Sequence, residues 1–225
     1  MEKIRTGLYG GSFNPIHNGH IAIARQMREK AGLEEVWFMV SPQNPLKERG
    51  SLLDDTRRME MTRAALRGMA GLKACGYEMS LPLPSYTWRT LQSLWRDFPE
   101  REFVLMIGAD NWARFGQWYH AADIMSSCEI LIYPRRGYNV AARSLPAGAR
   151  VVDTGLYDVS STEIRRLIKE GRDISSLVPA AIAEMAVRYY GGTAAECRRR
   201  RTRPPYQPPV DSCLGMVRTV ALTIS

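Results

Sequence analysis

The sequence predicts an α/β protein, a Rossmann-like doubly wound parallel sheet with helices on both faces. Short continuous apolar runs alternate along the chain with amphipathic segments, as buried parallel strands alternate with helices. Strands in such an order pair through right-handed crossovers, which cover both faces of the sheet. The length of 225 residues, with 45% hydrophobic and 24% charged residues, is that of an ordinary globular protein.

The first half of the chain predicts three strands and two helices. Residues 4–9 and 36–40 are apolar runs closed by a glycine pair and by Ser-Pro, so they read as buried strands. Residues 20–30 and 56–68 carry apolar side chains at helical spacing. Residues 72–80 are strand-like but less strongly patterned.

The second half repeats this alternation. Residues 103–107, which read FVLMI, are the clearest buried strand, and residues 88–98 place leucines and a tryptophan on one helical face. Two further strands and three helices complete the prediction, with strands at 129–133 and 150–153 and helices at 121–126, 161–170 and 179–190. Ligands of such sheets bind outside the carboxyl ends of the strands, which directs attention to residues 10–20, 41–47 and 108–110.

Composition and charge exclude several classes of protein. The chain has no apolar stretch long enough to span a membrane and no apolar segment at its start that would act as a signal peptide. Its four cysteines are far apart and form no C-x-x-C pair, which argues against a zinc site and a disulfide framework. We therefore expect a soluble cytoplasmic protein with reduced thiols and no membrane partner.

The basic residues are unevenly placed. The formal net charge is +8, and residues 194–225 hold half of it. Residues 197–209 read CRRRRTRPPYQPP, a composition that predicts disorder, so residues 193–225 are treated as a basic Pro/Arg-rich tail. An arm for nucleic acid or an acidic partner is one interpretation, and an extension without a binding role is the favoured one, because a charge run alone is a weak signal.

The strongest chemical signal follows the first predicted strand, where residues 10–20 read GGSFNPIHNGH. Glycines let the backbone approach a ligand closely, and a helix start offers free N–H groups to phosphate. Two of the three histidines, His17 and His20, fall here and are expected to face one anion. The alternatives are a plain glycine turn, structural histidines, or a metal pair, for which no third ligand lies nearby in the sequence. Neither the Walker A nor the G-x-G-x-x-G pattern is present.

A second signal lies at residues 159–166, which read VSSTEIRR. Ser160 and Glu163 have the spacing of a capping box, which explains these two residues structurally. Three consecutive hydroxyls and Arg165 one turn later are not explained by a cap, and together with the helix start they form a second anion cradle. Two cradles at one sheet edge favour a triphosphate ligand.

These two motifs resemble the signatures of the HxGH nucleotidyltransferase superfamily. Four stretches between them resemble the nicotinate-nucleotide adenylyltransferases within it: VWFMVSPQNPLK at 36–47, PSYT at 84–87, IGADN at 107–111 and QW at 117–118. The resemblance covers about residues 1–191, so we predict a nucleotidyltransferase domain at residues 1–192 and leave the tail outside it. The family often carries Asp where this chain has Asn14.

The resemblance implies transfer of AMP from ATP to nicotinate mononucleotide, giving nicotinate adenine dinucleotide and pyrophosphate in NAD biosynthesis. It implies that the catalytic residues are His17, His20 and Arg165. The ATP-binding residues would be Gly10, Gly11, Ser12, Phe13, His17, His20, Gly108, Asp110, Ser160, Ser161, Thr162 and Arg165. The second substrate would contact Asn44, Lys47, Tyr86, Thr87, Trp118 and Arg135, with its pyridine ring stacked on Trp118. Mg²⁺ would be carried with ATP and would need no protein metal site.

The sequence also allows three other interpretations of the function. Phosphopantetheine adenylyltransferase or a cytidylyltransferase would share the two signatures but not the combination of Ser85-Tyr86-Thr87 and Trp118. A nucleic-acid-binding protein would use the arginine tail and bind in a steeply salt-dependent manner, although nucleic acid is not an expected partner of the domain. A non-catalytic scaffold would bind ATP without releasing pyrophosphate. The sequence leaves a homo-oligomer open.

Overall fold

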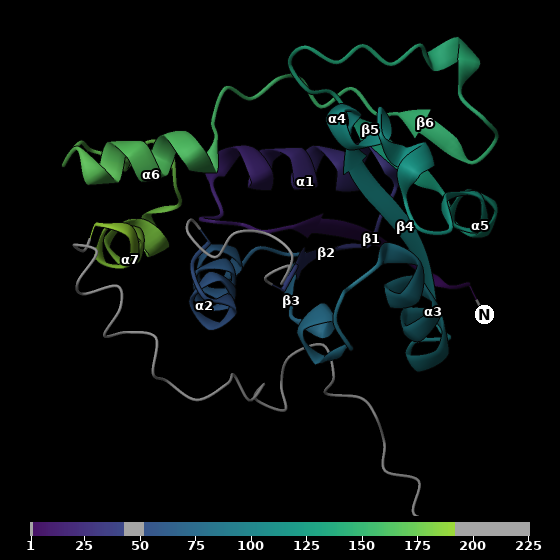
Figure 1. Ribbon diagram of the computed structural model, residues 1–225, viewed down its shortest axis with the longest axis horizontal. Coiled ribbons are helices and arrows are strands. Elements are labelled where there is room, and N and C mark those ends of the chain that lie inside the picture. Colours follow the sequence, from purple (N-terminus) through teal and green to yellow (C-terminus); the bar gives the residue numbers. More distant parts are fainter. Residues whose placement is uncertain (1, 43–51, 192–225) are drawn as a thin grey trace, which may run out of the picture.

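Six parallel strands form one sheet in the order β3-β2-β1-β4-β5-β6 (Figure 1). The computed structural model describes residues 2–42 and 52–191. The strands are β1 Ile4–Gly11, β2 Glu35–Val40, β3 Leu72–Cys75, β4 Arg101–Gly108, β5 Ile130–Tyr133 and β6 Ala149–Val151. The chain adds β2 and β3 on one side of β1 and the later strands on the other, so the order reverses between β1 and β4. This reversal places a ligand crevice at the carboxyl ends of β1 and β4.

Helices cover both faces of the sheet, and α1 and α3 lie on opposite sides of it in Figure 1. The α-helices are α1 Asn18–Ala31, α2 Asp55–Leu66, α3 Thr87–Asp97, α4 Ala109–Trp112, α5 Ala121–Ser127, α6 Ser161–Lys169 and α7 Ala180–Tyr190. Within the part of the chain that the structure describes, the short 3-10 helices are η1 Tyr77–Ser80, η2 Phe115–Gln117 and η3 Ala142–Ser144. The predicted doubly wound α/β fold is confirmed.

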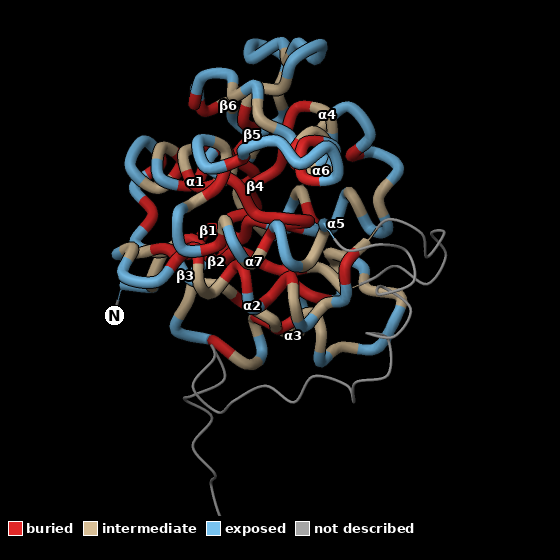
Figure 2. Tube along the Cα trace, turned by 90° about the vertical axis from the view of Figure 1, so that its left-hand side faces the viewer, coloured by how far each residue is buried: buried red, intermediate tan, exposed pale blue. Residues whose placement is uncertain are grey.

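The two faces of the sheet carry separate apolar cores, because successive side chains of a strand point to opposite sides. Tyr9 and Phe38 belong to the core that contains the buried side chains of α1, α2, α6 and α7. Leu8 and Trp37, their neighbours in the sequence, belong to the core under α3 and α5. The buried strands run through the centre of the molecule in Figure 2.

The predicted strand at 72–80 is wrong in its second half. The strand ends at Cys75, and Tyr77–Ser80 is a 3-10 turn in which the Met79 amide donates to the Gly76 carbonyl at 2.9 Å. The edge strand has only β2 as a partner, so nothing extends the ladder beyond the glycine. The short helices α4, η2 and η3 were not predicted, since they are too short to show a periodic pattern.

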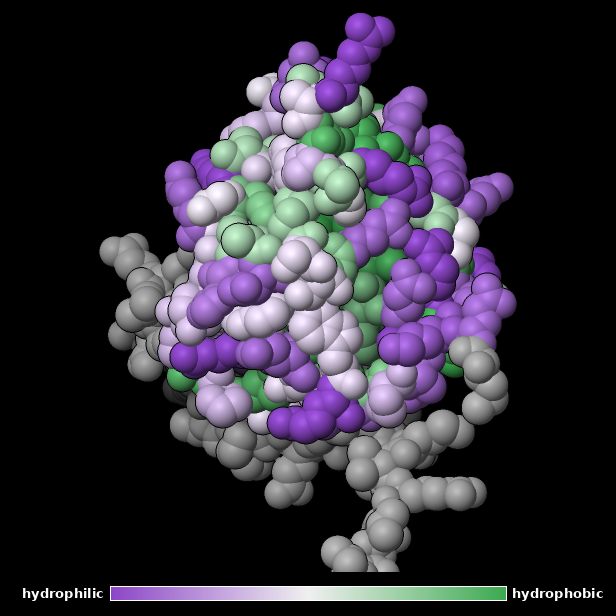
Figure 3. Space-filling view, turned by 90° about the vertical axis from the view of Figure 1, so that its right-hand side faces the viewer, coloured by the Kyte–Doolittle hydropathy of each residue, from purple (hydrophilic) through white to green (hydrophobic). Residues whose placement is uncertain are grey.

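Figure 3 shows hydrophobic side chains gathered over the upper and central part of one face, with hydrophilic side chains on both sides of them. Over residues 2–42 and 52–191, no helix combines the length and the apolar character needed to cross a bilayer.

Candidate active site

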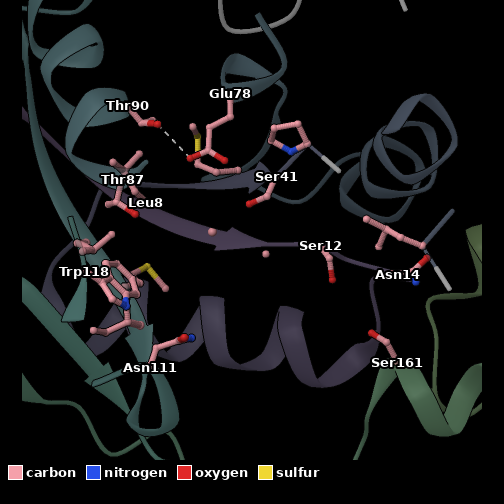
Figure 4. Close-up of a pocket in the computed structure, with 18 of the residues that line it drawn as sticks. Leu8, Ser12, Asn14, Ser41, Glu78, Thr87, Thr90, Asn111, Trp118 and Ser161 are labelled. Carbon is pink, nitrogen blue, oxygen red and sulfur yellow. Dashed lines mark hydrogen bonds between the residues drawn. The ribbon is translucent and has the colours of Figure 1, made fainter. Parts of the chain in front are cut away.

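A cavity of about 670 Å³ opens at the carboxyl ends of the central strands (Figure 4). Trp118, Thr87, Thr90 and Glu78 lie toward one end of it, and Asn14 and Ser161 lie toward the other, with Ser12 between. Of the predicted site residues, those that line it are Gly10, Gly11, Ser12, Thr87, Trp118, Ser161, Thr162 and Arg165. The cavity therefore brings together the two predicted anion cradles and part of the predicted second-substrate region.

The two loop histidines form a reciprocal cap at the start of α1, which begins at Asn18 rather than at His20 as predicted. Nδ1 of His17 accepts a hydrogen bond from the His20 amide, and Nδ1 of His20 accepts one from the His17 amide, both at 3.3 Å. The rings stack with centroids 3.6 Å apart and an interplanar angle of 20°. Because both Nδ1 atoms accept, each neutral ring carries its proton on Nε2.

Both histidines are neutral at pH 7. Burial, and after it the positive Arg135, lower the pKa of His17 to about 3. Burial, His17 and Arg135 together hold the pKa of His20 well below its ordinary value of 6.5. The pair therefore presents two uncharged Nε2–H donors. His17 is only 4% exposed and His20 is half-buried, so His20 is the more accessible donor although neither ring lines the cavity.

Phe13 anchors this loop in the core. It has a positive φ of 42°, is 2% exposed, and packs against Tyr9 and His20 at centroid distances of 5.6 and 5.1 Å. A residue other than glycine rarely adopts such a backbone angle. The side chain of Phe13 therefore fixes the loop beside the histidines and does not line the cavity.

The start of α6 is fastened to the same loop. The Ser161 hydroxyl donates to the Pro15 carbonyl at 2.8 Å, and Nη1 of Arg165 donates to the Asn14 carbonyl at 2.7 Å. Nη2 of Arg165 also donates to the Thr162 hydroxyl at 3.3 Å. Two segments almost 150 residues apart in the sequence thus form one polar wall of the cavity.

The predicted capping box at this helix is only half formed. The hydroxyl of Ser160 accepts from the Glu163 amide at 3.1 Å, as an N-cap does. The Glu163 carboxylate does not return to Ser160 but accepts from Nε and Nη2 of Arg166 at 2.9 and 2.6 Å. An exposed guanidinium one turn along the helix competes with the backbone amide for the carboxylate. Ser160 is exposed and does not line the cavity.

Gly108, Asp110 and Arg135 meet where β4 and β5 end. Nε of Arg135 lies 3.7 Å from Oδ1 of Asp110, and Nη2 of Arg135 lies 3.4 Å from the Tyr133 hydroxyl. A Cβ atom on Gly108 would approach Asp110 Oδ1 to 2.3 Å, so glycine allows this pairing. Arg135 was predicted to contact the second substrate, and its positive charge lowers the pKa of both loop histidines.

The second-substrate residues are only partly gathered. Thr87 and Trp118 line the cavity, whereas Tyr86, at 38% exposed, packs against Tyr119 with tilted rings whose centroids are 4.9 Å apart and is not part of the lining. Tyr86 is the N-cap residue of α3, and Thr87 begins the helix. Asn44 and Lys47 lie outside the described residues.

Sequence reasoning missed a carboxylate in this cavity. Oε1 of Glu78 accepts from the Thr90 hydroxyl at 3.2 Å, and Figure 4 shows the side chain of Glu78 beside Ser41. Burial raises the pKa of Glu78, and hydroxyls of Ser41, Thr90 and Ser85 partly oppose that rise. A single glutamate inside a segment read as a strand gave no motif by which it could have been found.

Residues 2–42 and 52–191 contain no group of three or more His, Cys, Asp or Glu side chains able to hold a metal ion. The carboxylate of Asp110 is paired with a guanidinium, which disfavours a cation beside it.

A glycine-rich loop, a helix start and a guanidinium converging at the switch point of a parallel sheet define a nucleotide-binding protein of the nucleotidyltransferase class. The model of the cytidylyltransferase-like family matches residues 8–167. The chain is 43% identical over 182 residues to the "Probable nicotinate-nucleotide adenylyltransferase" of Bacteroides fragilis, covering 81% of this chain and 90% of that protein. The similarly named protein of Porphyromonas gingivalis is 42% identical over 175 residues, 77% of this chain and 89% of the relative.

A solved structure shares the fold. The Plasmodium falciparum nicotinic acid mononucleotide adenylyltransferase, complexed with NaAD, superposes with a TM-score of 0.65 at 16% identity, covering 82% of this chain and 93% of that one. The chain belongs to the cytidylyltransferase-like family and, within it, to the nicotinate-nucleotide adenylyltransferases.

Proposed function

We propose that this protein transfers AMP from ATP to nicotinate mononucleotide, giving nicotinate adenine dinucleotide and pyrophosphate as a step of NAD biosynthesis. The observation that carries the proposal is the junction of the histidine loop with α6, where Arg165 and Ser161 are bonded to Asn14 and Pro15 at the cavity wall. Family membership supports the choice of substrates. The cavity volume of about 670 Å³ is in the range of small-molecule sites.

In this reaction an oxygen of the mononucleotide phosphate attacks the α-phosphorus of ATP in line. A new P–O bond forms, the bond from the α-phosphorus to the bridging oxygen breaks, and pyrophosphate takes the electron pair. A phosphate oxygen is already ionised at pH 7, so no general base is required. The protein's task is positioning and stabilisation of charge on the transferring group.

The histidines suit that task because they are neutral donors in a fixed orientation. Nε2–H of His20 would donate to an oxygen on the α-phosphoryl group, and His17 holds its ring by stacking and through the shared cap. A neutral imidazole can stabilise developing negative charge without first releasing a proton to the substrate. Arg165, with Ser160, Ser161 and Thr162, would hold the leaving pyrophosphate.

The remaining ATP contacts follow the strand ends. Gly10, Gly11, Ser12 and Phe13 would offer the loop backbone to the phosphates, with the Phe13 side chain anchoring the loop in the core. Gly108 and Asp110 would lie on the ribose or adenine side. Mg²⁺ carried with ATP would supply charge neutralisation on the triphosphate.

The opposite end of the cavity would take nicotinate mononucleotide. Its ring would stack on Trp118 next to Thr87, and Tyr86 and Arg135 would contribute at the rim and near the phosphate. Asn44 and Lys47, which the described residues do not include, remain proposed contacts. On the basis of the proposed substrates, we also propose that the protein is cytoplasmic.

The test is pyrophosphate release with ATP and Mg²⁺, comparing nicotinate mononucleotide, nicotinamide mononucleotide and phosphopantetheine. Release with the first alone is the expected result. Equal release with both pyridine nucleotides would retain the reaction and remove the selectivity for the acid. Release only with phosphopantetheine would refute the assigned substrate. Binding of ATP without release of pyrophosphate would favour a non-catalytic scaffold.

A further inference from the structure

Arg58, in the first turns of α2, is a fully buried arginine outside the cavity. Its side chain is 0% exposed, although arginine is seldom buried unless every donor is satisfied. Nε donates to the Leu53 carbonyl at 2.9 Å, and Nη2 donates to the Ser41 carbonyl at 2.8 Å. Nη1 donates to the Ser12 carbonyl, and Nη2 is also paired with Asp55. One guanidinium thus bonds three separate carbonyls and a carboxylate.

Two of these carbonyls lie where β1 and β2 separate. The last backbone bond between the two strand ends runs from the Ser41 amide to the Gly11 carbonyl at 3.0 Å. Beyond it, Ser12 enters the histidine loop and Ser41 turns away, so their carbonyls leave the regular ladder. The planar fork of a guanidinium supplies donors to both at once, which an ammonium group could not do in the same geometry.

The third carbonyl connects Arg58 to the other side of the loop. The Leu53 amide donates to Oδ1 of Asn14 at 3.2 Å, while the Asn14 carbonyl accepts from Arg165. The loop is therefore held by Arg58 from the α2 side and by Arg165 from the α6 side. Arg165 lines the cavity and Arg58 does not, so only Arg165 can contact a ligand there.

We infer that Arg58 is a positioning residue for adenylyl transfer, holding the Ser12 and Ser41 backbones at the spacing that aligns ATP with the second substrate. This inference rests on the proposed function. Ser12 and Ser41 both line the cavity, so a shift of either carbonyl moves the wall against which substrates bind. Misplacement by about 1 Å can lower a rate by roughly 10²-fold.

A second arginine provides a matched control. Arg101, with a side chain 13% exposed, donates from Nη1 to Glu35 at 3.0 Å and to the Thr6 hydroxyl at 2.9 Å. It lies at the start of β4, at the amino ends of the strands, whereas the cavity lies at their carboxyl ends. Arg101→Lys therefore removes a largely buried guanidinium that bonds Glu35 and Thr6 and has no contact with the cavity.

The experiment compares Arg58→Lys with Arg101→Lys at a temperature where thermal unfolding shows that both are folded. We expect Arg58→Lys to lower kcat about tenfold to a hundredfold, with KM for each substrate changing less than about threefold. We expect Arg101→Lys to lower the Tm with kcat within about twofold of the starting protein. Hydrogen exchange of residues 11–17 should quicken in Arg58→Lys and stay unchanged in Arg101→Lys.

Equal effects of the two substitutions on kcat, or an unchanged kcat in Arg58→Lys, would overturn the inference. If Arg58→Lys does not fold, Asp55→Asn decides, because it removes the carboxylate partner and keeps the guanidinium. A fall in kcat of about threefold or more at an unchanged Tm is then required, and its absence refutes the role. If the unsubstituted protein releases no pyrophosphate, the proposed function fails, while hydrogen exchange still tests whether Arg58 orders the loop.

Discussion

The buried histidine pair predicts that the protein loses stability in mild acid. A histidine whose pKa is lower in the folded state binds a proton more readily in the unfolded chain. Between the two pKa values, falling pH therefore favours unfolding, and stability is retained above the unfolded value. For His17 this window runs from the ordinary 6.5 down to about 3. His20 acts in the same direction.

The size of the effect follows from that window. Each pH unit inside it corresponds to about 1.4 kcal/mol for one group. Lowering the pH from 7 to 5 crosses about 1.5 units below the unfolded value, so His17 alone removes about 2 kcal/mol from the free energy of unfolding. A domain of this kind is stable by about 5–15 kcal/mol, which makes such a loss readily measurable.

The assay is urea unfolding at pH 5, 6 and 7 for the unsubstituted protein and for His17→Asn. Asparagine is a good N-cap residue, so this variant keeps an acceptor for the His20 amide while losing the titratable ring. The carboxylates titrate in both proteins. The difference between the two proteins in how steeply the free energy of unfolding changes with pH therefore isolates the contribution of His17. His120→Asn is the matched control, because that histidine is exposed and pairs with Asp123 away from the cavity.

We expect the stability of His17→Asn to fall by about 2 kcal/mol less between pH 7 and pH 5 than that of the unsubstituted protein. A lower stability at every pH would reflect only the smaller side chain and leaves the slope comparison intact. Parallel stability curves for the two proteins would refute the buried neutral histidine. If the free energy of unfolding of His120→Asn depends on pH as weakly as that of His17→Asn, the effect comes from the loss of any histidine and not from the buried His17.

Three further predictions concern the cavity and its supports. Replacing His20 by Ala should lower kcat by about 10²–10³-fold, as loss of a transition-state donor does, with retained far-ultraviolet circular dichroism showing an intact fold. Trp118→Ala should raise KM for nicotinate mononucleotide about tenfold and leave KM for ATP nearly unchanged in steady-state kinetics, whereas equal changes would contradict ring stacking. Tyr190→Phe removes a 2.7 Å hydrogen bond to Oδ1 of Asn14 and should cost about 1 kcal/mol in urea unfolding.

The sequence predicted the layers of the fold well because the central strands β2, β1, β4 and β5 carry runs of residues that are buried on both sides of the sheet. Continuous apolar runs such as residues 103–107 have no competing interpretation once helical segments flank them. It failed where a turn interrupts an apolar stretch, as at Gly76, and where a helix is a single turn, as in Ala109–Trp112. Local tertiary packing determines whether such short elements form. They are too short to show a periodic pattern of apolar residues from which they could be predicted.

In the candidate active site, the sequence predicted the histidine loop and the start of α6 as binding elements. It did not predict the hydrogen bonds that join these two elements. Ser161 and Arg165 bond to carbonyls, and any residue supplies a carbonyl, so no side-chain pattern could indicate the Pro15 and Asn14 contacts. Arg58 was missed for the same reason, since two of its acceptors are the backbones of Ser12 and Ser41. Glu78 was hidden inside a segment predicted as a strand.

The histidine loop also shows that a structural and a functional role need not be alternatives. A helix cap requires an acceptor, and His17 and His20 each provide one through Nδ1. Once Nδ1 accepts, the proton of a neutral ring resides on Nε2, on the far side of the imidazole. Burial keeps the rings neutral, so the cap itself produces two oriented donors. A serine or aspartate would cap the helix equally well, but neither would leave an N–H free for a phosphate oxygen.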